Sequence, residues 1–351
     1  MAESYRNILI TGGSGFMGSN FVRHMYTRYP KARIWNLDLL TYAGNKENLL
    51  DIEKVEAAKK DDEKRYTFVH GDICDAALLE KLFKANKFDL VVHFAAESHV
   101  DRSVFNVADF IRTNIEGTRH LMEAVQRHKA KRFVHISTDE IYGDVKNGFS
   151  DERAPLEPSN PYATSKAGAD LLVQSYIKTF KIPAVIVRGS NNYGPYQYPE
   201  KLIPLAISNL IEGKKIPVHG AGDQVRSWVH VNDFCTAVDI VSHYAPLYGI
   251  YNVSGEQRTN LEVLKSIASA LEKNLDDHKE HVTDRPAADS RYAVSGKKIE
   301  TELGWKRAET FDTAIPKLVT WYLDNKPWWK RIKEKSEYSN HYEKQAKAQW
   351  Y

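Results

Sequence analysis

Cysteine is scarce in this chain: there are two among 351 residues, Cys74 and Cys235. Two thiols cannot form a disulfide framework, and so low a number is typical of proteins in a reducing compartment. Long apolar runs are also missing, since none approaches the roughly 20 residues that a membrane-spanning helix requires. The amino terminus shows no charged-then-apolar signal segment. We therefore expect a cytoplasmic protein with no membrane partner.

A strong charge of one sign is absent as well. Lysine and arginine total 49 against 46 aspartate and glutamate, for a formal net charge of +3. A balance this even gives no indication of a nucleic-acid partner. The hydrophobic content of 42% is ordinary, and 351 residues can bury one large core or two moderate ones.

Short β-branched runs alternate with helical stretches through the first half of the chain. The runs predict six strands, at 7–11, 33–38, 66–70, 90–94, 132–137 and 184–187. Such alternation predicts an α/β protein with a Rossmann-type doubly wound parallel sheet. Proline and glycine become frequent from about Tyr193. We expect one domain over 1–190 that contains this sheet, and a smaller region over 191–351.

A glycine-rich turn follows the first predicted strand and opens the first predicted helix. Gly12, Gly15 and Gly18 permit a tight turn, close approach to a pyrophosphate and close helix–strand packing. The helix N-terminus would then face the phosphates with its N–H groups. Asp38 ends the second strand, where a carboxylate accepts hydrogen bonds from the adenosine ribose and disfavours a 2′-phosphate. The cofactor is therefore predicted to be NAD.

Other residues of the cofactor site are predicted from their places at strand ends. Asp72 and Ile73 follow the third strand, and Ala95 and Ala96 follow the fourth, where they would form the adenine and nicotinamide-ribose walls. The full set of predicted cofactor-binding residues is Gly12, Gly15, Phe16, Met17, Gly18, Asp38, Asp72, Ile73, Ala95, Ala96, Thr113, Tyr162, Lys166 and Asn192.

A tyrosine and a lysine four residues apart form the predicted redox centre. Tyr162 and Lys166 follow Pro161 on an expected helix, so they would lie one turn apart on the same face. A phenol titrates near pH 10, and the ammonium together with the positive nicotinamide would bring its pKa toward neutrality. Thr138, at the end of the fifth strand, could hydrogen-bond the same substrate hydroxyl.

The adjacent carboxylates of Asp139 and Glu140 follow Thr138 directly. Taken alone, this pair is what the start of a helix often carries, because the helix dipole stabilises acidic residues there. In a redox site the pair has a second use: mutual repulsion separates the two titrations, so that one carboxyl can donate a proton while the other accepts one.

These motifs resemble the extended short-chain dehydrogenase/reductase family, and within it the dTDP-glucose 4,6-dehydratases. The matching segments are Phe94–Ser103, Ser137–Gly143, Ser190–Tyr196, Pro199–Pro204 and Trp328–Trp329. The resemblance implies that Tyr162 removes the 4-hydroxyl proton while hydride leaves C4 for NAD. Glu140 would then remove the C5 proton and Asp139 would protonate the departing 6-hydroxyl. Hydride return to C6 leaves a 4-keto-6-deoxy sugar.

The resemblance also implies that 1–190 is the NAD-binding domain and that 191–351 is mainly a nucleotide-sugar-binding domain. The predicted nucleotide-sugar-binding residues are Ser98, Thr138, Asn191, Lys201, Leu202, His219, Arg226, Asn260 and Arg285. Two segments depart from the thymidine enzymes: His219 stands where a tyrosine is usual, and 284–291 lacks the usual Gly-His. The stretch His219–Trp228 is similar to UDP-glucose 4,6-dehydratases. The substrate therefore stays open between dTDP-glucose, UDP-glucose and UDP-N-acetylglucosamine.

Three alternatives share much of this pattern. A nucleotide-sugar 4-epimerase uses the same fold, NAD and Tyr–Lys pair but has no need for Asp139 and Glu140. A 4,6-dehydratase that inverts C5 would differ only in its pocket geometry. A non-catalytic NAD-binding protein is disfavoured, because Thr138, Tyr162 and Lys166 are all present. We expect a homodimer, as is usual in the family, and no metal site.

Overall fold

Seven parallel strands form the centre of the molecule in the computed structural model, which describes residues 5–284 and 288–346. The strand order is β10-β6-β5-β4-β1-β2-β3. The bounds are β1 Asn7–Thr11, β2 Arg33–Asp38, β3 Tyr66–His70, β4 Leu90–His93, β5 Arg132–Thr138, β6 Ala184–Gly189 and β10 Ile250–Val253. Six of these confirm the strands predicted from sequence, with ends shifted by at most two residues.

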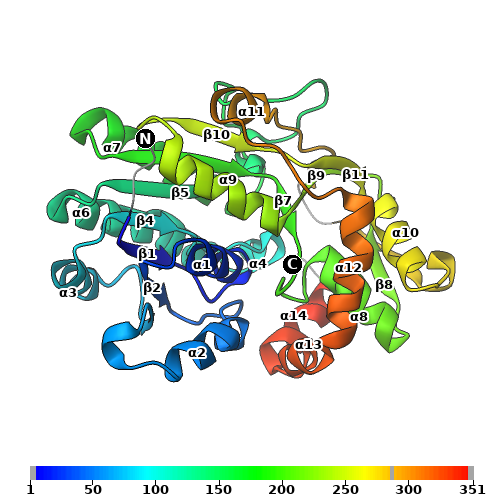
Figure 1. Cartoon of the computed structure of the whole chain (residues 1–351). Coiled ribbons are helices and arrows are strands. Elements are labelled where there is room, and N and C mark those ends of the chain that lie inside the picture. The colour runs from blue at the N-terminus through cyan, green and yellow to red at the C-terminus, as the bar shows by residue number, and fades with distance from the viewer. Residues whose placement is uncertain (1–4, 285–287, 347–351) are drawn as a thin grey trace.

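Helices cover both faces of this sheet, as a parallel sheet requires. On β1, Ile8 and Ile10 pack toward α1 and α9, whereas Leu9 between them packs toward α3 and α6. The helix α7 lies beside α6 on the second face (Figure 1). The bounds of these helices are α1 Phe16–Arg28, α9 Val231–Tyr244, α3 Ala76–Asn86, α6 Thr118–His128 and α7 Pro161–Phe180.

The chain returns to the large sheet after it has left for the second region. Helix α9 packs on α1, and β10 extends the sheet beyond β6 through the register Ile250–Ile186. The strand β10 was not predicted, because Asn252 interrupts its short apolar run. Residues from both sides of position 190 therefore build the large sheet.

A smaller region stands at the carboxyl edge of the sheet, at the right of Figure 1. Its helices are α8 Leu202–Glu212, α10 Asn260–Ala270, α12 Phe311–Asp324, α13 Lys326–Lys333 and α14 Ser336–Ala346. Two small sheets complete it, one from β7 Asn191–Tyr193, β9 Val225–His230 and β11 Glu256–Thr259, the other from β8 Ile216–His219 and β12 Lys279–Val282. These helices surround a second apolar core that contains Tyr193, Leu210 and Trp329.

Shorter helices connect the main elements. They are η1 Lys46–Leu49, α2 Leu50–Ala57, η2 Asp61–Glu63, α4 Val100–Phe105, α5 Val107–Phe110, the π-helix η3 Ile111–Gly117, the 3-10 helix η4 Asp139–Tyr142, η5 Leu275–Asp277 and α11 Lys297–Leu303. None of the described helices is both long enough and apolar enough to cross a membrane. On α13, Trp329 is fully buried and its indole N–H donates to Tyr322 O.

Candidate active site

One cavity of about 400 Å³ lies where the carboxyl ends of β1, β4, β5 and β6 meet the smaller region. Every predicted catalytic, cofactor-binding and substrate-binding residue within the described part of the chain lines this cavity. The structure thus brings together side chains from Gly12 to Asn260. Arg285, also predicted to bind substrate, lies outside the described residues.

The glycine-rich turn is shaped by close backbone contacts. Gly12 has φ +70°, and a Cβ on it would lie 2.5 Å from Ala95 N. A Cβ on Gly18 would collide with the Gly12 carbonyl oxygen, because α1 packs tightly on the turn. A Cβ on Gly15, in contrast, would meet only Gly12 O within 4 Å. Gly15 also caps α1, so the turn and the helix N-terminus offer a cradle that fits a pyrophosphate.

Asp38 is fixed at the end of β2 by two backbone donors. Leu40 N–H donates to Oδ1 at 2.8 Å and Ser14 N–H to Oδ2 at 2.9 Å. Burial raises the pKa of Asp38, and these two hydrogen bonds oppose the rise. Each carboxylate oxygen keeps a second lone pair, so the residue can accept hydrogen bonds from a ribose in the cavity.

Tyr162 and Lys166 both lie in the first turns of α7, as predicted. Asn160 caps the helix by accepting from Ala163 N at 2.9 Å, and Pro161 occupies its first turn. The Lys166 ammonium donates to Ile136 O at 2.6 Å, on the neighbouring strand β5. The tyrosine and lysine are therefore held against the end of β5.

The groups around Tyr162 act on its pKa in opposite directions. Burial raises the pKa of the phenol, the Glu140 carboxylate raises it further, and the neighbouring Thr138 hydroxyl lowers it. Burial also lowers the pKa of Lys166 to about 8. Both side chains lie almost wholly out of water, and the lowering of the phenol pKa by the ammonium together with a bound nicotinamide stays a prediction.

Asp139 and Glu140 form the first turn of η4, directly after β5. The Thr138 hydroxyl caps this turn by accepting from Glu140 N at 3.3 Å. Burial, followed by the Glu140 charge, raises the pKa of Asp139 to about 7, while the neighbouring Ser190 hydroxyl lowers it. Among the described residues, Asp139 Oδ2 and Glu140 Oε2 are buried without a hydrogen-bond partner. One carboxyl is thus poised to donate a proton in the cavity where the other can accept one.

Sequence reasoning missed Asn114, which joins two parts of the site. Its side-chain oxygen accepts from Glu97 N at 2.9 Å, and its amide donates to Glu97 O at 3.0 Å and to Ser165 Oγ at 2.8 Å. Asn114 lies on the π-helix η3, and π-helices often occur at functional sites. A π-turn leaves no clear period in the sequence, so no signal marked this residue.

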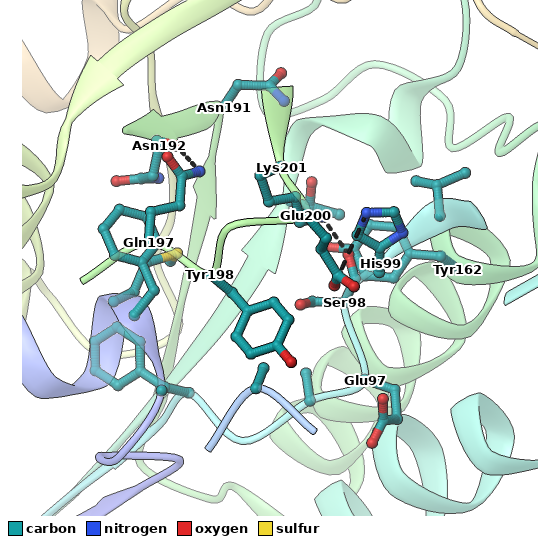
Figure 2. Close-up of a pocket in the computed structure, with 18 of the residues that line it drawn as sticks. Glu97, Ser98, His99, Tyr162, Asn191, Asn192, Gln197, Tyr198, Glu200 and Lys201 are labelled. Carbon is teal, nitrogen blue, oxygen red and sulfur yellow. Dashed lines mark hydrogen bonds and ion pairs between the residues drawn. The ribbon is translucent and has the colours of Figure 1, made fainter. Parts of the chain in front are cut away.

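The substrate end of the cavity is formed by the smaller region and by the segment after β4. Figure 2 shows Lys201 beside Ser98, and the Lys201 ammonium donates to Ser98 O at 3.1 Å. Arg226 donates to Asp289 O at 2.9 Å, and its guanidinium lies 4.2 Å from the centroid of the Tyr292 ring. Asn260 donates to Gln224 Oε1 at 3.1 Å.

Three comparisons with known proteins agree with this geometry. A family model described as GDP-mannose 4,6 dehydratase matches residues 9–318. The chain is 44% identical over 350 residues to a dTDP-glucose 4,6-dehydratase of Neisseria meningitidis, covering 93% of this chain and 96% of the relative. A corresponding Escherichia coli protein is 43% identical over 360 residues, with 94% and 97% covered.

Solved structures give the same result. A dTDP-glucose 4,6-dehydratase from Streptomyces venezuelae, solved with NAD bound, superposes with a TM-score of 0.87 at 41% identity, covering 93% of this chain and 99% of that one. A UDP-glucose 4-epimerase from Thermus thermophilus, also with NAD, reaches a TM-score of 0.81 at 27% identity, with 91% and 99% covered. The chain therefore belongs to the nucleotide-sugar 4,6-dehydratases of the extended short-chain dehydrogenase/reductase family.

Proposed function

We propose that this protein is an NAD-dependent hydro-lyase that converts dTDP-glucose to its 4-keto-6-deoxy derivative. The observation that carries the proposal is the position of Asp139 and Glu140, which line the same cavity as Thr138, Tyr162 and Lys166. A 4-epimerase needs only the redox centre, whereas loss of water across C5 and C6 needs an additional acid and base.

NAD fits the cradle formed by the glycine-rich turn and Asp38, and when bound it supplies the oxidant for C4 and the reductant for C6. In the proposed sequence Tyr162 accepts the 4-hydroxyl proton, and the resulting 4-ketone acidifies C5–H. Glu140 removes the C5 proton and Asp139 protonates the 6-hydroxyl, so that the C6–O bond breaks and water leaves. A proton then returns to C5, and the net change is the loss of one water from the sugar.

The dTDP nucleotide is proposed because the relatives that cover nearly the whole chain at 42–45% identity carry that name. Ser98, Lys201 and Arg226 supply the polar and cationic groups that a diphosphate sugar requires. His219 and the 284–291 segment depart from the thymidine enzymes, so the nucleotide has to be measured directly.

The test is incubation of the holoenzyme with dTDP-glucose, UDP-glucose and UDP-N-acetylglucosamine in parallel, followed by NMR of the products. We expect a 4-keto-6-deoxy product with retained C5 configuration, formed fastest from dTDP-glucose. A 4-epimer from any of them would refute the dehydratase. A faster reaction of a UDP sugar would refute only the nucleotide assignment, and an inverted C5 only the stereochemical one.

We further propose a cytoplasmic homodimer. Both cysteines are free thiols, as expected in a reducing compartment. Exposed apolar side chains occur on α5, η3 and α7, namely Val107, Ile111 and Leu171, and a second copy of this chain would cover them. Light scattering of the wild type should give twice the chain mass, and Leu171→Asp should give the monomer; a wild-type monomer would refute the dimer.

A further inference from the structure

The C-terminal helix α14 packs against the outside of the wall that carries Ser98 and Lys201. Figure 1 shows this helix beside α8 and α13 in the smaller region. Glu337, Tyr338 and His341 occupy neighbouring positions on one side of the helix. All three contact residues of two segments, 98–102 and 197–201, most of whose residues line the cavity.

Glu337 acts on the cavity wall through an arginine. Arg102 Nη1 donates to Glu337 Oε1 at 3.0 Å, and its Nε and Nη2 both donate to Glu200 Oε2 at 3.0 Å. The guanidinium also lies 3.7 Å from the centroid of the Tyr42 ring. Arg102 therefore bridges the exposed Glu337 to Glu200, whose side chain is only 1% exposed.

His341 reaches the same carboxylate from another side. Its Nε2 lies 3.8 Å from Glu200 Oε2, and its ring meets the His99 ring edge-on, with 5.0 Å between centroids. His99 Nε2 lies 3.9 Å from Glu200 Oε1, and Figure 2 shows the two side chains facing one another. These two imidazoles and the carboxylate lie close enough together to ligate a metal. With Arg102, which donates to Oε2, they form a polar network around Glu200.

The network adjoins two predicted substrate contacts, because His99 follows Ser98 and Glu200 precedes Lys201. Tyr338 OH donates to Pro199 O at 3.2 Å, so α14 holds the backbone as well as the Glu200 side chain. Lys201 follows directly and donates to Ser98 O. Lys201 and Ser98 therefore both lie next to residues that α14 holds in place.

Glu200 is sensitive to its partners because it is buried. Burial raises the pKa of its carboxyl to about 7, while Arg102 and Lys201 lower it. When a partner of a buried charge is removed, the carboxylate either takes up a proton or moves toward another donor. Either response would displace Lys201, the next residue in the chain.

We propose that Glu337 and His341 are positioning residues that, through Arg102 and Glu200, hold Lys201 and Ser98 where the nucleotide sugar binds. This inference rests on the proposed function. It predicts that changes on α14 weaken substrate binding without affecting the glycine-rich turn or the catalytic groups. Because Glu337 lies at the surface, its contribution should be smaller than that of the buried His341.

The experiment compares four variants with the wild-type holoenzyme. His341→Phe keeps a ring against His99 but removes Nε2, His341→Gln restores a polar group, and Glu337→Gln removes the charge that faces Arg102. Glu343→Gln removes a charge from the exposed side of the same helix and is the control. For each, KM and kcat with dTDP-glucose, bound NAD and the melting temperature are measured.

We expect His341→Phe to raise KM about tenfold, and Glu337→Gln about threefold, as the loss of one contact to a charged group does. Bound NAD should not change, and His341→Gln should recover part of the loss. If packing alone mattered, His341→Phe would match the wild type and His341→Gln would be worse, which would overturn the proposal.

An inactive wild-type enzyme would refute the proposed function and not the positioning role, so the two failures can be told apart. With an active wild type, a KM unchanged in both His341→Phe and Glu337→Gln would refute the positioning role. A change that appears equally in Glu343→Gln, or only together with loss of NAD, would refute it as well. If His341→Phe does not fold, the surface variant Glu337→Gln decides alone.

Discussion

The protonation of Asp139 allows a direct test of the proposed acid. Its pKa is raised from 3.8 to about 7 by burial and by the Glu140 charge. That difference corresponds to about 4 kcal/mol against ionisation in place. A raised pKa favours the protonated form, so about half of these carboxyls carry a proton at pH 7, against fewer than about one in a thousand at the ordinary value.

If Asp139 donates the proton to the leaving hydroxyl, kcat/KM should fall about tenfold per pH unit above about pH 7. The assay is formation of the 4-keto product, followed by its absorbance in alkali, from about pH 6 to about pH 9. The parameter kcat/KM is chosen because it reports the ionisation of the free enzyme, the state that the structure describes.

A variant at Ser190 distinguishes the titration of Asp139 from that of Lys166, whose pKa is about 8 and whose titration could give a similar falling limb in the pH profile. The neighbouring Ser190 hydroxyl lowers the pKa of Asp139, so Ser190→Ala should move the falling limb to higher pH. Lack of any fall between about pH 6 and pH 9 would refute the reasoning. So would an unmoved limb in Ser190→Ala, or the same limb in the residual activity of Asp139→Asn.

Three further predictions follow from single contacts. Glu140→Gln should abolish dehydration but leave partial reduction of bound NAD, visible by absorbance on adding substrate; full activity would exclude Glu140 as the base. Gly12→Ala should lower the free energy of unfolding by about 2–4 kcal/mol and release NAD, because φ is positive there and the new Cβ would clash with Ala95. The control is Gly148→Ala, where φ is +69° but the space is open, so that only the backbone strain should lower the stability. Equal losses for the two variants in urea unfolding would contradict this prediction. Asp239→Asn should cost about 3 kcal/mol at pH 7, because the buried carboxylate accepts from two histidines and a tyrosine. Burial raises the pKa of Asp239, but these partners lower it by more. The loss of unfolding free energy should therefore be full above about pH 4 and shrink as the pH falls further. A difference in unfolding free energy that stays constant with pH, measured with urea, would refute this.

Most of the large sheet could be predicted because its strands are buried on both faces. A run such as 132–137 contains enough apolar and β-branched residues to be recognised as a buried strand, and glycine and proline occur in segments between such runs. Strand β10 could not be predicted, because Asn252 interrupts its short apolar run and its place beyond β6 depends on how α9 packs on α1. The burial of Trp329 likewise depends on the whole second core.

The site shows the same division between local and distant effects. Thr138, Asp139 and Glu140 could be predicted because a short strand end carries them, and Tyr162 and Lys166 because a helix fixes their spacing. The contact of His341 with Glu200 joins residues far apart in the sequence, so no local pattern indicates it. The pKa of Tyr162 was not predictable either, since it depends on desolvation in the folded cavity.

One strand end accounts for most of the proposed chemistry. Thr138 is the last residue of β5 and lowers the pKa of the Tyr162 phenol, while the next two residues turn into η4 and are the proposed acid and base. A 4-epimerase superposes on this chain over most of its length, so the fold alone does not select the reaction. In the proposed mechanism, a dehydratase differs because Asp139 is buried deeply enough to keep a proton near neutral pH, one residue away from the carboxylate proposed as the base.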